Sequence, residues 1–383
     1  MKINTIIKPM LLSVGLLVIS CSDDDNDGNS NNNPVEKTAI VNNYVNIVST
    51  AYKKSVSSAK TFNTALKTLA ANKDEAALTA AKQAWLNARE DYQPTEAFRF
   101  YGPIEEVIEG SQDLPYEVSI NAWPLDEATV LDFIADNTTF NEALFLSEFN
   151  EDDNITIVWH PIEFILWGAD PDKTDGKIAG NKTIAEFTDN QFDYLVAAGD
   201  LLIKYLNDVA GEWASDGAFR AEFVTDTNQA LENVLLSIGT LANAELGGER
   251  TLDPWNSPGE DAEHSCFSDN TNRDNALNWE GVVGVYQGNL AGATGASIED
   301  LVKEADSKLA AEITAQIGLV NEILAVINPL EFEDVIQPGN PNRELIFTEG
   351  VDTEEKTLVS RLNTFGNLII RAGNALGLQV TVN

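Results

Sequence analysis

Apolar residues recur every three or four positions along most of this chain, and that spacing restricts it to helices. Over residues 38–71 the recurring residues are Val41, Val45, Val48, Tyr52, Val56, Ala59, Phe62, Leu66 and Leu69. The same spacing predicts further helices at residues 75–93, 126–135, 189–212, 218–245, 297–328 and 352–377. The sequence has no alternating strand pattern of any length. We therefore expect an all-α fold whose interior positions are filled by aliphatic side chains.

The predicted helical region, residues 38–377, is longer than a typical single domain. We expect two packed helical bundles, roughly residues 38–215 and 216–377, with a functional site between them. The formal net charge of −37 argues against nucleic acid and anionic lipid as partners, because their phosphates require a basic surface. An acidic surface concentrates cations near the protein, but it does not by itself make a metal site.

Residues 1–20 have the features of a secretory signal, with two lysines followed by an apolar run from Met10 to Ile19. That run is too short to remain as a membrane-spanning helix. Residues 18–21 resemble a bacterial lipobox, which predicts cleavage before Cys21 and attachment of lipid to its thiol. An ordinary signal peptide with an incidental cysteine is the alternative.

Residues 21–37 read as an acidic, asparagine-rich tether with too few apolar side chains to fold. The acidic run resembles the surface-export signal of Bacteroidetes lipoproteins, although a solvated spacer has the same composition. We expect an outer-membrane lipoprotein, held to the membrane by lipid on Cys21, on either the periplasmic or the cell-surface side. With Cys21 lipidated, Cys266 has no second cysteine, so no internal disulfide is expected.

The chain has only two histidines, and the first lies in an apolar segment, residues 159–168. Pro161 suits a first helical turn, and Gly168 suits the end of a short buried helix. His160 and Glu163 are three residues apart, so both can project from one side of the first turn as two arms of a metal site. In the alternative interpretation His160 caps the helix and Glu163 reaches back to the cap.

A second segment, residues 85–100, places aromatic and charged side chains at three- and four-residue steps. Pro94 is expected to kink or restart the helix there. The residues on this face are Trp85, Arg89, Tyr92, Glu96 and Arg99. They form either a functional face or a solvated face with intrahelical ion pairs such as Glu96 with Arg99.

The second histidine lies in a long polar segment, residues 249–275, where His264, Ser265, Cys266, Ser268 and Asp269 follow one another closely. A polar loop of this length is usually functional or disordered. The alternative is that its serines and acids cap a helix starting near residue 276. A free cysteine such as Cys266 is usually a small buried hydrophobe.

Four segments resemble the imelysin family, also called imelysin-like peptidases or iron-regulated protein A homologues. Residues 159–168 resemble its G-x-H-x-x-E segment, with Val158 in place of the glycine. Residues 85–98 resemble W-x-x-x-R-x-x-Y-x-x-x-E-x-F, and residues 121–126 resemble N-x-W-P-x-D. Residues 263–272 resemble E-H-S-C-F-S-D-N-T-H, except that Asn272 replaces the last histidine. If that histidine is a ligand in relatives, this chain binds differently or not at all.

The resemblance implies a lipoprotein that binds a metal ion or an iron-containing ligand in iron acquisition, with an outer-membrane iron-uptake partner. The predicted metal ligands are His160 and Glu163, with Glu96, Asp269 and His264 as weaker candidates. The predicted orienting residues are Arg89, Arg99 and Ser268. Oxygen-rich ligands with one or two imidazoles suit iron, manganese, calcium or zinc, of which iron and zinc are the leading candidates.

Two other functions remain open from the sequence. A metallopeptidase would use His160 and Glu163 as zinc ligands and Glu96 as the general base, but it needs a further protein ligand. The sequence contains no H-E-x-x-H, no G-x-S-x-G and no phosphate-binding glycine loop. A non-catalytic scaffold or receptor accessory would use the His160–Glu163 pair merely as a helix cap.

Overall fold

The computed structural model describes residues 35–109, 111, 114–148, 158–169, 180–257, 263–348 and 356–382. Residues 35–383 form one unit by their internal contacts. The predicted signal peptide, Cys21 and most of the predicted tether lie outside the described residues, as does most of the glycine-, lysine- and aspartate-rich stretch at residues 170–182. The division into halves near residue 215 stays a prediction.

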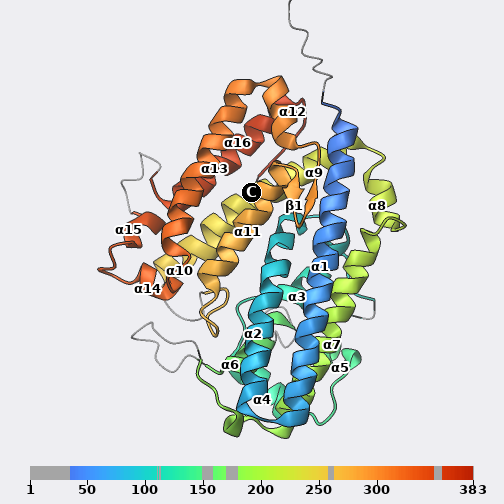
Figure 1. Ribbon diagram of the computed structural model, residues 1–383, viewed down its shortest axis with the longest axis vertical. Helices are drawn as coiled ribbons and strands as arrows, with labels where there is room; N and C mark the ends of the chain where they lie inside the picture. The colour runs from blue at the N-terminus through green and yellow to red at the C-terminus, as the bar shows by residue number, and fades with distance from the viewer. Residues whose placement is uncertain are drawn as a thin grey trace, which may run out of the picture. The chain divides into compact units, whose positions relative to one another are not determined.

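Three long helices run side by side: α1 (Lys37–Asn72), α2 (Glu75–Tyr92) and α7 (Asp189–Glu212), as Figure 1 shows. Their bounds confirm the predicted helices at residues 38–71, 75–93 and 189–212. Asp74 begins α2 by accepting a hydrogen bond from the backbone N–H of Ala77, and Thr188 begins α7 with a reciprocal capping box.

The C-terminal helices pack against one another around α16 (Leu358–Ala375). The helices in this group are α9 (Thr227–Thr240), the π-helical η4 (Leu241–Leu252), α12 (Ile298–Ala305) and α13 (Ser307–Ile327). Within the described part of the chain, α13 alone is long and apolar enough to cross a bilayer, and here it packs on α12 and α16. Helix α11 (Thr271–Tyr286) contacts α2 as well as α9, η4, α12 and α13, so it joins the two groups.

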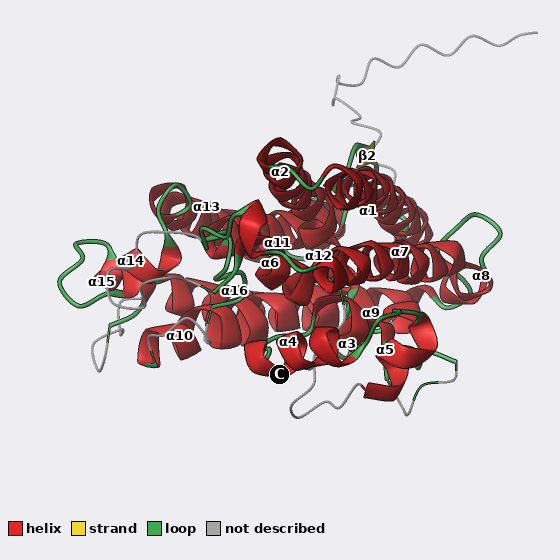
Figure 2. Cartoon of the chain, turned by 90° about the horizontal axis from the view of Figure 1, so that it is seen from below, coloured by secondary structure: helices red, strands yellow, loops and turns green. Residues whose placement is uncertain are grey.

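Short elements complete the fold, and Figure 2 shows helix in nearly every described segment. The short helices are η1 (Gln93–Phe98), η2 (Gly102–Glu105), α3 (Tyr116–Asn121), α4 (Glu127–Asp136), α5 (Glu142–Glu148), α6 (Trp159–Trp167), η3 (Ile184–Glu186), α8 (Ala218–Phe223), α10 (Asp253–Asn256), α14 (Phe332–Ile336) and α15 (Arg343–Ile346). A two-stranded antiparallel hairpin pairs β1 (Asn289–Leu290) with β2 (Ala293–Thr294). The predicted all-α fold is confirmed.

Several predicted boundaries are wrong. The helix predicted over residues 218–245 is two helices, because Asp226 caps a new start for α9. The chain's helical path does not stop at Gly247-Gly248 but continues to Leu252 and directly into α10, which ends at Asn256. A Cβ on Gly247 would lie 3.1 Å from the Asn363 side chain of α16, so glycine there serves close packing.

Two more boundaries differ further along the chain. Asp306 divides the helix predicted over residues 297–328, because its side chain accepts hydrogen bonds from the first backbone N–H groups of α13. Helix α11 begins at Thr271, which shortens the predicted polar loop. The predicted start of the last helix, from residue 352, falls partly outside the described residues, and α16 begins after the cap residue Thr357.

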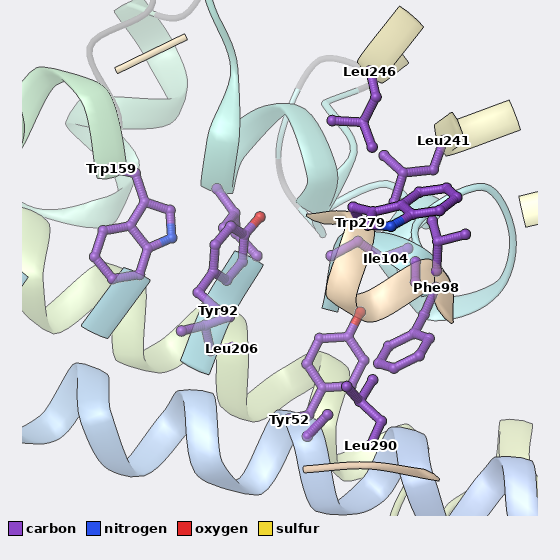
Figure 3. Close-up of a cluster of buried hydrophobic side chains, with 14 of the residues drawn as sticks. Tyr52, Tyr92, Phe98, Ile104, Trp159, Leu206, Leu241, Leu246, Trp279 and Leu290 are labelled. Carbon is purple, nitrogen blue, oxygen red and sulfur yellow. The ribbon is translucent and has the colours of Figure 1, made fainter. Parts of the chain in front are cut away.

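Helix α6 packs against α2 and α7, and aromatic contacts hold its first residue. Figure 3 shows Trp159 beside Tyr92, and their ring centroids lie 5.4 Å apart. Trp159 also stacks on Phe62 of α1 and meets the edge of Trp85 of α2. Because Trp159 is the first residue of α6, these contacts fix the position of the helical turn that carries His160.

Substitution of Gly281 should destabilise the fold, because α11 crosses η1 at this residue without room for a side chain. A Cβ there would collide with the carbonyl oxygen of Pro94. We expect Gly281→Ala to lower the free energy of unfolding by about 1–3 kcal/mol, as overpacking of a close contact does. Urea unfolding measures the change.

Gly318 provides the matched control, since a Cβ added in the middle of α13 meets nothing within 4 Å. Gly318→Ala should raise the free energy of unfolding by about 0.5–1 kcal/mol through helix propensity alone. Equal effects of the two substitutions would contradict the close contact between α11 and η1.

Candidate functional site

The short helix α6 carries the first histidine into the protein interior. All nine of its residues are buried, as predicted, and it ends at Gly168 with a φ of 80°. The residue before the helix is Val158, whose φ of 72° is unusual for a β-branched residue. His160 is inside the helix and no side chain caps its start. The interpretation of His160 and Glu163 as a capping pair is therefore wrong.

His160 and Glu163 instead contact each other through their side chains. His160 Nδ1 lies 3.0 Å from Glu163 Oε2, and both side chains are fully buried. Glu163 Oε1 accepts two hydrogen bonds from Ser268, one from the backbone N–H at 3.0 Å and one from the hydroxyl at 2.6 Å. The two side chains project from the same side of the first turn, as expected, and both carboxylate oxygens of Glu163 have partners within the protein.

The second histidine meets the first. The ring centroids of His160 and His264 lie 4.7 Å apart in an edge-to-face arrangement, and Trp123 contacts His160 at 5.2 Å. His264 Nε2 lies 3.3 Å from Asn121 Nδ2, at the end of α3. The structure thus brings together three segments that the sequence singled out separately.

Each imidazole keeps one buried nitrogen without a hydrogen-bond partner among the described residues: His160 Nε2 and His264 Nδ1. A buried polar atom without a partner costs free energy unless something else binds it. Burial, together with Arg89 and Arg250, lowers the pKa of both histidines well below the usual value. Both imidazoles are therefore neutral at neutral pH, which is the state that binds metal.

Arg89 lies behind this pair and is fully buried. Its guanidinium pairs with Asp274 of α11 through Nε at 3.2 Å and Nη2 at 2.8 Å, and its Nη1 donates to Asn121 Oδ1 at 2.8 Å. Trp85, Tyr92 and Glu96 are buried too, so this face is not solvated, although the ion pair between Glu96 and Arg99 named in that alternative does form.

Glu96 belongs to a separate network of charges. It accepts hydrogen bonds from Arg99 at 3.1 Å, Arg250 at 2.9 Å and the Tyr92 hydroxyl at 2.9 Å. Burial alone would raise the pKa of Glu96, but the two guanidinium groups outweigh it and lower this pKa to about 2. Glu245 pairs with Arg99 at 2.6 Å and with Arg250 at 3.3 Å.

A pocket of about 360 Å³ lies between this charge network and His264, and His160 does not line it. Its walls include Arg99, Glu117, Asn121, Glu245, Arg250 and His264. Burial raises the pKa of Glu117 to about 7, against the opposing effect of Arg99 at 3.0 Å. Sequence reasoning missed Glu117, Glu245 and Arg250. Glu245 and Arg250 are five residues apart, and the π-helix, which the sequence did not indicate, carries both into this network, where they pair with each other.

The family model described as imelysin matches residues 48–361 of this chain. The chain belongs to the imelysin family. Two solved structures share its fold. An iron-regulated protein A precursor from Parabacteroides distasonis has 19% identity over 91% of this chain and 95% of its own, with a TM-score of 0.62. An imelysin-like protein from Psychrobacter arcticum has 14% identity over 91% and 99%, with a TM-score of 0.65. No curated protein matches. At these identities the likeness to the two structures establishes the fold alone.

The remaining predicted site residues of this imelysin-family chain occupy different surroundings. Asp269 follows Ser268 at a φ of 54°, in the turn before α11. Cys266 is buried, as a small hydrophobe would be. Asn272 donates to the carbonyl oxygens of Ile327 at 3.0 Å and Leu330 at 2.6 Å, and so ties α11 to the end of α13. The described residues contain no group of three or more His, Cys, Asp and Glu side chains placed to hold a metal ion.

The buried carboxyl of Glu163 predicts a pH dependence of stability in the imelysin-family protein. Burial raises the pKa of Glu163 from 4.5 to about 8, so the folded protein keeps a proton that the unfolded chain loses. The stability from this group is complete below pH 4.5 and is lost as pH rises through 8. From pH 6.5 to 8 we expect a loss on the order of 1–2 kcal/mol from this group.

Glu163→Gln keeps the shape of the protonated carboxyl and cannot ionise. This substitution should therefore remove the loss of unfolding free energy between pH 6.5 and 8 that comes from Glu163. Urea unfolding at pH 6.5 and 8, in the presence of chelator, measures it. Glu90→Gln, at an exposed carboxylate, is the control and should keep the wild-type decline. An unchanged decline in Glu163→Gln would show that Glu163 is already ionised in the folded protein.

Proposed function

We propose that this protein binds a metal ion or an iron-containing ligand, with His160 Nε2 as the protein's own ligand atom. The observation that carries the proposal is the buried Nε2 of His160, which lacks a partner in the described structure while Nδ1 is held by Glu163. A metal-binding histidine commonly has its second ring nitrogen against a carboxylate, which fixes the ring and raises its basicity. Because burial raises the pKa of Glu163 to about 8, a metal at Nε2 would displace one proton from the Glu163–His160 pair, and the proton that remains would lie on Nδ1. A metal ion bound at Nε2 would act as a Lewis acid at this site.

Glu163 then acts behind His160 rather than on the metal. Its Oε2 faces His160 Nδ1 and its Oε1 accepts both hydrogen bonds from Ser268, so direct coordination would cost these contacts. Ser268 supports the carboxylate, in agreement with the orienting role predicted for it. Arg99 is committed to Glu96, Glu117 and Glu245 instead.

The small number of protein donors favours a ligand that brings its own metal-binding atoms. No set of three potential metal-binding side chains converges in the described part of the chain. The neighbouring pocket, at about 360 Å³, has room for a small molecule. An iron complex with oxygen donors, completed by His160, suits both features.

The cellular role proposed here is iron acquisition outside the cytoplasm. The supporting features are the signal-like residues 1–20, the lipobox ending at Cys21 and the acidic tether. We propose that lipid on Cys21 holds the protein at the outer membrane, on its periplasmic or cell-surface side, near an iron-uptake partner. The net charge of −37 favours cationic over polyanionic ligands.

Metallopeptidase activity has weaker support. Glu96, the candidate general base, is held by two guanidinium groups and the Tyr92 hydroxyl, and its pKa is lowered to about 2. A general base works best with a pKa near the working pH. Glu96 is therefore poorly suited to take a proton at neutral pH.

Elemental analysis tests the metal-binding proposal. The protein is purified without chelator, loaded with iron or zinc, and compared with His160→Ala. We expect close to one metal per chain in the wild type and a loss of at least tenfold in His160→Ala, because no other described donor set replaces the imidazole. Circular dichroism shows whether the variant keeps its helices.

Two further samples, Glu90→Gln and wild-type protein loaded with an iron complex, separate specific from adventitious binding. Glu90→Gln removes a surface carboxylate and should leave the metal content unchanged, even though an acidic surface attracts cations. Metal absent from the wild type after loading with the free ions and also with an iron complex, or equal amounts in the wild type and His160→Ala, would contradict the proposal. Binding of an iron complex but not of the free ion would support the ligand-borne form.

A further inference from the structure

Arg89 determines which way the side-chain amide of Asn121 faces. An amide side chain can turn either end toward a neighbour, but a guanidinium only donates hydrogen bonds. Arg89 Nη1 lies 2.8 Å from Asn121 Oδ1, and Asp274 holds the guanidinium in place through two further bonds. The oxygen of Asn121 must therefore face Arg89, and its NH2 group faces away.

Asn121 in turn determines the proton position on His264. The NH2 group of Asn121 faces His264 Nε2 at 3.3 Å, so Nε2 must accept. A neutral imidazole carries its single proton on the other nitrogen, here Nδ1. Asp274 Oδ2 lies 3.9 Å from Nδ1, and its negative charge favours a proton on that side.

Asp274 Oδ2 does not fully bind that proton. It already accepts from Arg89 Nε and Nη2 and from the Ser265 hydroxyl at 2.6 Å, and 3.9 Å is too long for a hydrogen bond. His264 Nδ1–H is therefore a buried donor held beside a saturated carboxylate.

We infer that Arg89, acting through Asn121, fixes the proton of His264 on Nδ1 and so leaves His160 as the metal-binding imidazole. The second half of this inference rests on the proposed function. To bind a metal at Nδ1, His264 would have to move its proton to Nε2, where it would face the NH2 group of Asn121, donor against donor. His264 is then a hydrogen-bond donor, and Arg89 and Asn121 are positioning residues.

Nitrogen NMR of the histidine rings tests the proton position directly. The chain has two histidines, so protein labelled with 15N-histidine gives two ring systems, and His160→Gln identifies the signals of His264. In metal-free wild-type protein at pH 7.5, we expect His264 Nδ1 in the shift range of a protonated nitrogen and Nε2 in that of a bare one. A protonated Nε2 with a bare Nδ1 would overturn the inference.

Asn121→Asp tests the relay without changing the size of the side chain. One carboxylate oxygen still accepts from Arg89, but the other now faces His264 Nε2 as an acceptor. We expect the Nε2 signal to move from the bare to the protonated range. Asn87→Asp adds the same charge at an exposed position of α2 and should leave both nitrogens unchanged. An Nε2 that stays bare in Asn121→Asp would overturn the relay.

Asn121→Ala covers the case in which the buried aspartate prevents folding. It removes the donor without adding an acceptor, so the shifts of His264 should move toward the average of the two tautomers. Shifts identical to those of the wild type would show that Asn121 does not set the proton.

Zinc titration then tests the assignment to His160. We expect zinc to perturb the His160 ring while His264 keeps its proton on Nδ1. Loss of the Nδ1 proton of His264 on zinc addition would overturn the assignment. If zinc perturbs neither ring, the zinc form of the proposed function fails and the assignment to His160 falls with it, whereas the metal-free spectra still decide whether Arg89 and Asn121 fix the tautomer.

Discussion

The buried ion pair between Arg89 and Asp274 is the contact on which the candidate site depends. It joins α2 to α11, and neither side chain is exposed. Burying two charges is costly, and the pair is tolerable only because further hydrogen bonds satisfy it. Asn121 accepts from Arg89, while Ser265 and Asn270 donate to Asp274. The same bonds that stabilise the charges also order the segments around His264.

The two histidines differ in the side chain that contacts one ring nitrogen: Glu163 for His160 and Asn121 for His264. This difference gives the two rings different chemistry. His160 Nδ1 faces a carboxyl group, and its Nε2, which has no partner among the described residues, is the atom proposed to bind an external ligand. His264 Nε2 faces an amide whose orientation is set by a permanent cation, so its Nδ1 carries the proton. Two imidazoles 4.7 Å apart are therefore not interchangeable, although their exposure is almost the same.

What could be predicted from the sequence was local. Apolar spacing predicted the bounds of α1, α2 and α7 to within a residue, and the three-residue step placed His160 and Glu163 on one side of a helical turn. The π-helix could not be predicted, because its glycines look like a stop while their actual role is close approach to α16. The meeting of His160 with His264 depends on how α6 and the segment before α11 pack, which no short-range pattern reports.

Asn272 shows how a departure from the family pattern acquires a structural role. It replaces a histidine of the imelysin-like segment, and its amide donates to two carbonyl oxygens at the end of α13. A neutral imidazole has one N–H and could satisfy only one of them. With asparagine at this position the chain has one potential metal ligand fewer, and α11 donates two hydrogen bonds to the end of α13 instead of one. In the proposed function, the chain therefore supplies fewer metal-binding atoms than the family pattern suggests, and these atoms come from His160 and from the bound ligand.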